Sequence, residues 1–252
     1  MGKTPGFSDH FSAIAGQYAS HRPTYPRELF QWLAELCGAR ELALDVGTGN
    51  GQAAVALAEH FARVVATDPS REQLERATPH ARVEYRCALA HERVLEPSSA
   101  DLITAATAAH WFDSSAFHAE VERILKPGGV LAVWNYAPAS VSEPVDEVLV
   151  ALGARVASFW PPERKFVDSG YRTLPFPYAD LAAPRFQCRM SWTAPQFLGY
   201  AATWTAVQRA RRELPTDVLA EFAPRLERAW GSEARDVVWP IALRVGRKPG
   251  SP

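Results

Sequence analysis

The stretch that most constrains the fold of this chain runs from Leu42 to Gln52, where a short apolar segment leads into three glycines at alternate positions. Residues 42–46 have the composition of a buried β-strand, and residues 53–59 are good helix formers. A strand, a tight glycine turn and a helix together build a nucleotide-type site at the carboxyl end of a parallel strand. Glycine suits such a turn because it accepts a positive φ and lets a ligand approach the backbone. The stretch therefore predicts an α/β fold with a ligand site at this turn.

The composition of the 252-residue chain is that of a globular protein. Hydrophobic residues make up 47% and charged residues 22%, and the net charge of −1 gives no electrostatic reason to expect a nucleic acid or a membrane surface as partner. The three cysteines, Cys37, Cys87 and Cys188, are scattered, which argues against a metal site and favours a reducing cytoplasm. No apolar run is long enough to span a membrane, and no signal peptide opens the chain.

Strand-like and helix-like segments alternate up to residue 136, which predicts a parallel sheet with right-handed crossovers. After residue 136 the alternation breaks, and we expect a helical cap, inserted after the fifth strand, over the carboxyl edge of the sheet. Strands are expected at 42–46, 64–67, 83–87, 101–105, 130–136, 185–192 and 237–245, and cap helices at 143–160, 195–213 and 216–230.

The glycine turn is compatible with either a nicotinamide dinucleotide or S-adenosylmethionine. A nicotinamide-binding loop has a third glycine where this chain has Gln52. Asp68, at the end of the second expected strand, could accept both hydroxyls of a ribose in either ligand. Asp45 favours S-adenosylmethionine, because a carboxylate there can bind an ammonium group or organise the turn but would repel a pyrophosphate.

Several motifs resemble those of the class I S-adenosylmethionine-dependent methyltransferases, in the branch called methyltransferase type 11, which includes relatives of trans-aconitate methyltransferase. The segment from Asp45 to Gly51 is similar to motif I of that family, and the segment from Val65 to Asp68 to its acidic second motif. Further similarity lies in residues 109–113 and 124–129, and in the amino-terminal residues Phe11, Tyr18, Arg22, Pro23, Tyr25 and Pro26. Five motifs in the right order make this resemblance specific, although each alone is not.

The resemblance implies a Rossmann-like, doubly wound sheet of seven strands, the last of them antiparallel. It also implies three regions within a single domain: an amino-terminal helical lid (1–40), a cofactor-binding core (41–136), and a cap with the last two strands (137–252). The implied cofactor is S-adenosyl-L-methionine. Its binding site is implied to consist of Gly47, Thr48 and Gly49 at the methionine part, Asp68 at the ribose, and Pro69, Gln73, Ala88 and Leu89 at the adenine.

Three further residues have two interpretations each. Tyr18 and Arg22 could close over the cofactor, with Arg22 pairing a carboxylate of methionine or of an acidic substrate, or their helix could merely pack on the sheet. His110, just past the fourth strand, could be a general base or a structural histidine. Six aromatic residues are candidates for the wall of the site: Trp134, Tyr136, Phe159, Trp160, Trp192 and Trp204.

We expect a methyltransferase that acts on an oxygen, nitrogen or carbon atom of a small molecule, a carboxylate included. Such an enzyme needs no metal and no covalent nucleophile, because the cofactor already carries an activated methyl group, so alignment of the acceptor is the main task. Two alternatives are a methyltransferase-fold protein that only binds a ligand or partner, and a nicotinamide-dependent oxidoreductase. The sequence assigns neither the acceptor nor an oligomeric state.

Overall fold

The structure is a computed structural model that describes residues 22–250. The described residues form a seven-stranded sheet with the order β3-β2-β1-β4-β5-β7-β6. Strands β1 to β5 run parallel, and β7 is antiparallel to both of its neighbours, β5 and β6. The predicted fold class is therefore confirmed. The strands are β1 (Leu42–Val46), β2 (Arg63–Asp68), β3 (Val83–Cys87), β4 (Ala100–Ala106), β5 (Leu125–Tyr136), β6 (Gln187–Trp192) and β7 (Arg235–Arg247).

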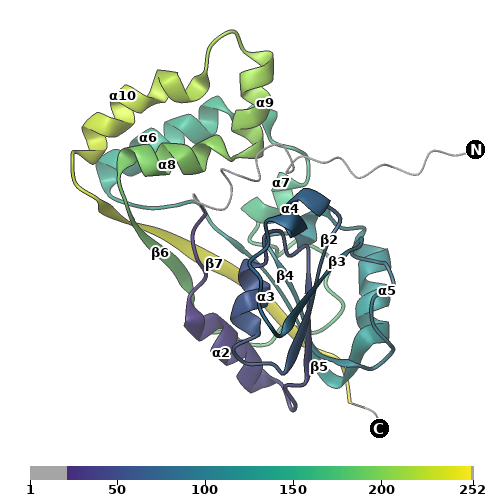
Figure 1. Ribbon diagram of the computed structural model, residues 1–252. Coiled ribbons are helices and arrows are strands. Elements are labelled where there is room, and N and C mark those ends of the chain that lie inside the picture. The colour runs from purple at the N-terminus through teal and green to yellow at the C-terminus, as the bar shows by residue number, and fades with distance from the viewer. Residues whose placement is uncertain (1–21, 251–252) are drawn as a thin grey trace, which may run out of the picture.

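Helices cover both faces of the sheet, and a separate group of helices lies beyond one end of it (Figure 1). On the sheet lie α2 (Arg27–Leu36), α3 (Gln52–Leu57), α4 (Arg71–Glu75) and α5 (Ser114–Ile124), with the short helix η2 (Ala109–Trp111) after β4. The cap contains α6 (Glu143–Arg155), η3 (Ala157–Phe159), α8 (Ala194–Ala202), α9 (Thr205–Glu213) and α10 (Val218–Trp230). Helix α7 (Arg164–Asp168) lies between the cap and the sheet, where it contacts η2. None of the helices in residues 22–250 has the length and hydropathy of a membrane-spanning segment.

The sheet buries both of its faces because successive side chains of a strand point to opposite sides. In β1, Ala43 packs with residues of α2 and α3, whereas Leu44 and Val46 pack on the other face with residues of α5. Helix α2 is part of this core, with Leu29 and Leu33 fully buried. The remainder of the expected lid, residues 1–21, lies outside the described residues.

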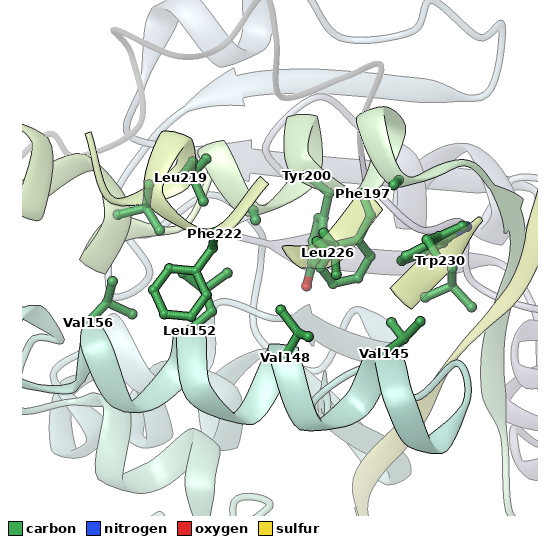
Figure 2. Close-up of a cluster of buried hydrophobic side chains, with 14 of the residues drawn as sticks. Val145, Val148, Leu152, Val156, Phe197, Tyr200, Leu219, Phe222, Leu226 and Trp230 are labelled. Atoms are coloured by element: carbon green, nitrogen blue, oxygen red, sulfur yellow. The ribbon is translucent and has the colours of Figure 1, made fainter. Parts of the chain in front are cut away.

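The cap has its own hydrophobic core, which is continuous with the sheet. Figure 2 shows Val145, Val148 and Leu152 of α6 facing α10, with Phe222 and Leu226 between the two helices. The same cluster includes Trp192 of β6 and Trp239 of β7, so these two strands pack against the cap helices.

The structure differs from the expected element boundaries at the start of β5, which lies at the amino end of the strand, and in the second expected cap helix, which lies beside the site. Strand β5 begins at Leu125, five residues before the expected start, because Leu125 pairs with Ala100 ahead of a register shift in the β4–β5 ladder. The expected helix at 195–213 is two helices, α8 and α9. They are separated at Thr203, whose hydroxyl donates back to Tyr200 O (2.7 Å), and Trp204, which has an extended backbone.

Candidate functional site

The glycine turn after β1 is tightly held. Gly47, Gly49 and Gly51 all have positive φ angles, of 70°, 56° and 85°. The backbone N–H groups of Gly47 and Thr48 both donate to Thr67 O, at 2.8 and 2.9 Å, which fixes the turn to the end of β2. A β-carbon on Gly47 would lie 2.5 Å from Ala108 Cβ, so no larger residue fits there without movement. The turn therefore presents bare backbone at the carboxyl edge of the sheet.

Asp68, the last residue of β2, connects this turn to helix α4. Its Oδ2 accepts a hydrogen bond from Gly49 N and its Oδ1 accepts one from Ser70 N, both at 2.9 Å. Ser70 in turn caps α4, because its hydroxyl accepts from Gln73 N. The carboxylate thus organises two backbone segments at the position where the sequence predicts a ribose.

Three buried polar atoms around the turn have no hydrogen-bond partner among the described residues. They are Asp45 Oδ2 and Thr48 Oγ1, which interact weakly with each other without a hydrogen bond within 3.5 Å, and Gln73 Oε1. The other oxygen of Asp45 accepts from Thr104 Oγ1 at 2.6 Å. Burial, with a smaller contribution from the charge of Asp68, raises the pKa of Asp45 to about 6. Buried polar groups are normally paired, so this cluster fits a polar, positively charged ligand such as the methionine end of S-adenosylmethionine.

The predicted adenine residues come after β2 and β3, at the same carboxyl edge of the sheet. Pro69 is next to Asp68, and Ala88, directly after β3, donates its N–H to Asp68 O at 3.2 Å. Leu89 is among the few large hydrophobic side chains of the described chain that are exposed (36%). The structure thus brings together nine of the predicted cofactor residues along β1, β2 and β3. They are Asp45, Gly47, Thr48, Gly49, Asp68, Pro69, Gln73, Ala88 and Leu89; Tyr18 lies outside the described residues.

A cavity of about 380 Å³ lies between the carboxyl ends of β4 and β5 and the cap helices. Thr107 and the segment from Asn135 to Ala139 form its wall on the side of the sheet. Of the six candidate aromatic residues, Tyr136, Trp160 and Trp204 line it. Trp134 and Trp192 are buried in the protein core, and Phe159 is partly buried against the core of the cap. Arg22 also lines the cavity, and its guanidinium donates to Tyr136 Oη.

The segment after β4 joins the glycine turn to this cavity. Ala108 and Phe112 contact the space beside Gly47, while His110 and Trp111 line the cavity. The same short segment therefore borders both the glycine turn and the cavity, so ligands held in the two places would be neighbours.

His110 is buried at the base of the cavity. Its Nδ1 lies 2.7 Å from Tyr171 Oη, and Tyr171 is fully buried with a positive φ of 63°, an uncommon conformation for a bulky residue. Burial, together with the nearby charge of Arg164, lowers the pKa of His110 to about 3. The imidazole is therefore neutral at physiological pH.

Two polar residues of the cavity, Asn135 and Arg164, were not predicted from the sequence. Asn135 could have been noticed as the polar residue that ends the apolar run of β5. Arg164 lies in the connector after α6, where the sequence gives no periodic signal. Only folding of the cap brings it to the end of β5.

Comparison with known proteins agrees with this geometry. Residues 44–133 match the family model described as "Methyltransferase domain". A Dictyostelium discoideum protein, provisionally named a methyltransferase, is 32% identical over 96% of this chain and 96% of its own length. A solved structure from Anaeromyxobacter dehalogenans, provisionally named a type II methyltransferase, is 47% identical, with a TM-score of 0.86 over 91% of this chain and 99% of that one.

A more distant relative specifies the cofactor by name. It is a Saccharomyces cerevisiae protein named as a probable S-adenosylmethionine-dependent methyltransferase, 28% identical over 54% of this chain and 49% of its own length. The fold, the glycine turn with its acidic partners and the full-length relatives agree with one another. The chain belongs to the class I S-adenosylmethionine-dependent methyltransferases.

Proposed function

We propose that this enzyme methylates a small molecule held in the cavity between β4, β5 and the cap. The observation that carries this proposal is the position of the cavity, which shares the segment from Thr107 to Phe112 with the glycine turn. A cavity of about 380 Å³ is of the size that proteins use for small ligands. The three free cysteines support the further proposal that the protein works in a reducing cytoplasm.

S-adenosylmethionine, when bound, supplies a methyl group on a positively charged sulfur. We assign its methionine part to Asp45, Thr48 and the backbone of the glycine turn, which hold unpartnered acceptors in a buried setting. Asp68 is assigned to the ribose hydroxyls. Pro69, Gln73, Ala88 and Leu89 are assigned to the adenine.

The residues of the cavity have to orient the acceptor and exclude water. The aromatic side chains of Trp160 and Trp204 provide apolar surface for this purpose. His110 is too weak a base at its lowered pKa to hold a proton, which supports an orienting role. A neutral imidazole fixed by Tyr171 can still make one hydrogen bond to an acceptor.

Calorimetric titration with S-adenosylhomocysteine and with NAD tests the cofactor assignment, and we expect saturable binding of the first alone. Incubation with a small-molecule cell extract and isotope-labelled S-adenosylmethionine, followed by mass spectrometry, tests the acceptor. We expect label in a molecule small enough for the cavity. Label found only in protein or nucleic acid would contradict the proposal, and cofactor binding without any transfer would favour a binding protein.

Cofactor affinity should depend on pH through Asp45. Because the folded-state pKa is raised to about 6, the ionised carboxylate that would pair with the cofactor's ammonium disappears as the pH falls below that value. We expect the affinity for S-adenosylhomocysteine to fall by about tenfold per pH unit below pH 6. Calorimetry at a series of pH values between 5 and 8 measures this dependence.

The variant Asp45→Asn separates this effect from other titrations. Asparagine keeps an oxygen to accept from Thr104 Oγ1 but carries no charge. A raised folded-state pKa means that the charged form destabilises the empty protein above pH 6, so the variant should be more stable there, by at most about 3 kcal/mol. Its cofactor affinity should be low and independent of pH. A steep pH dependence in the variant would contradict the assignment of Asp45.

A further inference from the structure

The charges of the acceptor cavity are unbalanced. Its wall, as far as residues 22–250 form it, carries two guanidinium groups, Arg22 and Arg164, and a single carboxylate, Asp146. Both oxygens of Asp146 are already engaged, because they accept from Ser140 Oγ and Val141 N, each at 2.7 Å. Among the residues of the wall the arginines therefore outnumber the carboxylates, and Arg164 pairs through its Nε with Asp168, which lies outside the wall.

Arg164 is fixed in one orientation but still has donors to offer. Its Nε donates to Asp168 Oδ1 at 2.6 Å, and its guanidinium stacks on Trp160, 4.1 Å from the ring centroid. The two terminal nitrogens have no hydrogen-bond partner in the described part of the chain. The side chain is 26% exposed, so these donors are partly shielded from water. A preorganised guanidinium with free terminal nitrogens is suited to a carboxylate.

The charge of Arg164 reaches the interior of the cavity. It contributes to the low pKa of His110. Together with Arg22 it also favours ionisation of Tyr200, although burial dominates and raises the pKa of that phenol overall. Both arginines therefore lie toward the same buried phenol.

Asn135 supplies an independent observation that points to a polar ligand. The residue is 1% exposed and lines the cavity, and neither its Nδ2 nor its Oδ1 has a hydrogen-bond partner within 3.5 Å among the described residues; the amide interacts only weakly with the Tyr171 phenol. A buried amide with neither group paired is rare in native proteins. A ligand with polar atoms at this end of the cavity would satisfy it.

The rest of the wall is apolar. Helix α6 packs Val145, Val148 and Leu152 against α10 and turns Leu149 and Val150 to the cavity, where Val150 is 73% exposed. Trp160 and Trp204 also line the cavity, and their ring centroids are 6.2 Å apart.

We propose that the methyl acceptor is a small organic acid with an apolar body, whose carboxylate is bound by Arg164 and also reaches Asn135. Trp160, Trp204 and α6 enclose the apolar body. This proposal rests on the proposed function and narrows it, since it names the chemical class that the cavity selects.

Matched acid and amide probes test this selection. We choose 3-phenylpropionate, octanoate and cyclohexylacetate, each with its primary amide, and titrate them calorimetrically into protein saturated with S-adenosylhomocysteine. At least one acid should bind saturably and about tenfold more tightly than its amide, because only the acid forms charge-assisted hydrogen bonds. Equal binding of acid and amide, or no binding by any acid, overturns the proposal.

Variants test which residues cause the preference for the acid over its amide. Arg164→Gln should abolish the preference for the acid and leave amide affinity unchanged, whereas Arg172→Gln, an exposed arginine of the same connector outside the cavity wall, should keep the preference. Asn135→Leu should weaken acid binding while the thermal midpoint of the empty protein stays the same or rises, since a buried unpaired amide is removed. Retention of the preference in Arg164→Gln overturns the proposal.

The same titrations distinguish this proposal from the proposed function. Failure to bind S-adenosylhomocysteine would defeat the proposed function whatever the probes show. A labelled product whose unmethylated precursor carries no acidic group would leave the proposed function intact and defeat the organic-acid assignment alone.

Discussion

Replacement of Gly47 by alanine is expected to destabilise the protein by about 2–5 kcal/mol, as measured by denaturant unfolding. An alanine at a φ of 70° costs about 1–2 kcal/mol because its β-carbon crowds the backbone. The new β-carbon would also lie 2.5 Å from Ala108 Cβ, and overpacking of this kind typically costs another 1–3 kcal/mol or so. The variant should also bind the cofactor less tightly, because the glycine turn has to move to relieve the clash with Ala108.

Gly128→Ala is the matched control. Gly128 has a similar φ of 79°, but a β-carbon there would have no heavy atom within 4 Å. It should therefore show the conformational cost alone, about 1–2 kcal/mol, and normal cofactor affinity. If Gly47→Ala and Gly128→Ala lower the free energy of unfolding by the same amount, the close contact between the glycine turn and the segment after β4 is not the reason that position 47 requires glycine.

Asp68→Ala should weaken the binding of S-adenosylhomocysteine by about 2–3 kcal/mol, or roughly 30- to 150-fold. The substitution removes a charged acceptor proposed for the ribose. It also releases the N–H groups of Gly49 and Ser70 that the carboxylate now holds. Calorimetric titration of the variant measures the loss.

Asp217→Ala provides the comparison for this variant. Asp217 also accepts a hydrogen bond from a backbone N–H, that of Leu219 (3.0 Å), and it pairs with Arg211. Unlike Asp68, it is the N-cap residue of α10, one of the cap helices. Its loss should cost about 1 kcal/mol of stability and leave cofactor affinity unchanged. Unchanged affinity in Asp68→Ala as well would place the ribose elsewhere.

The sheet could be predicted from the sequence because its signals are local. Buried parallel strands are short apolar runs between helices, and the glycine turn specifies its own geometry, so β1 was predicted with its observed limits, Leu42–Val46. The cap was predicted less accurately. Helices α8 and α9 are separated where the hydroxyl of Thr203 donates locally to Tyr200 O, which the apolar periodicity does not reveal, and α7 has too few residues for a periodic pattern.

The proposed cofactor residues could likewise be predicted from the sequence, whereas the residues of the acceptor cavity could not. The proposed cofactor residues follow strand ends within motifs that can be recognised in the sequence, such as Asp68 after β2. Asn135 and Arg164 become neighbours of one cavity only when the cap folds over β5, and no spacing in the sequence links them. The strained backbone of Tyr171 is likewise a property of the folded state.

The cap is not a contiguous piece of the chain. Its helices come from two segments, residues 137–186 and 193–234, with the edge strand β6 between them, and β6 pairs with β7 alone. Because residues from both segments line the cavity, a change of acceptor by recombination would have to exchange both segments together with the strand between them. Gradual substitution on α6, α7 and α9 is therefore the more accessible evolutionary route to new acceptors, while β1 to β5 keep the cofactor edge intact.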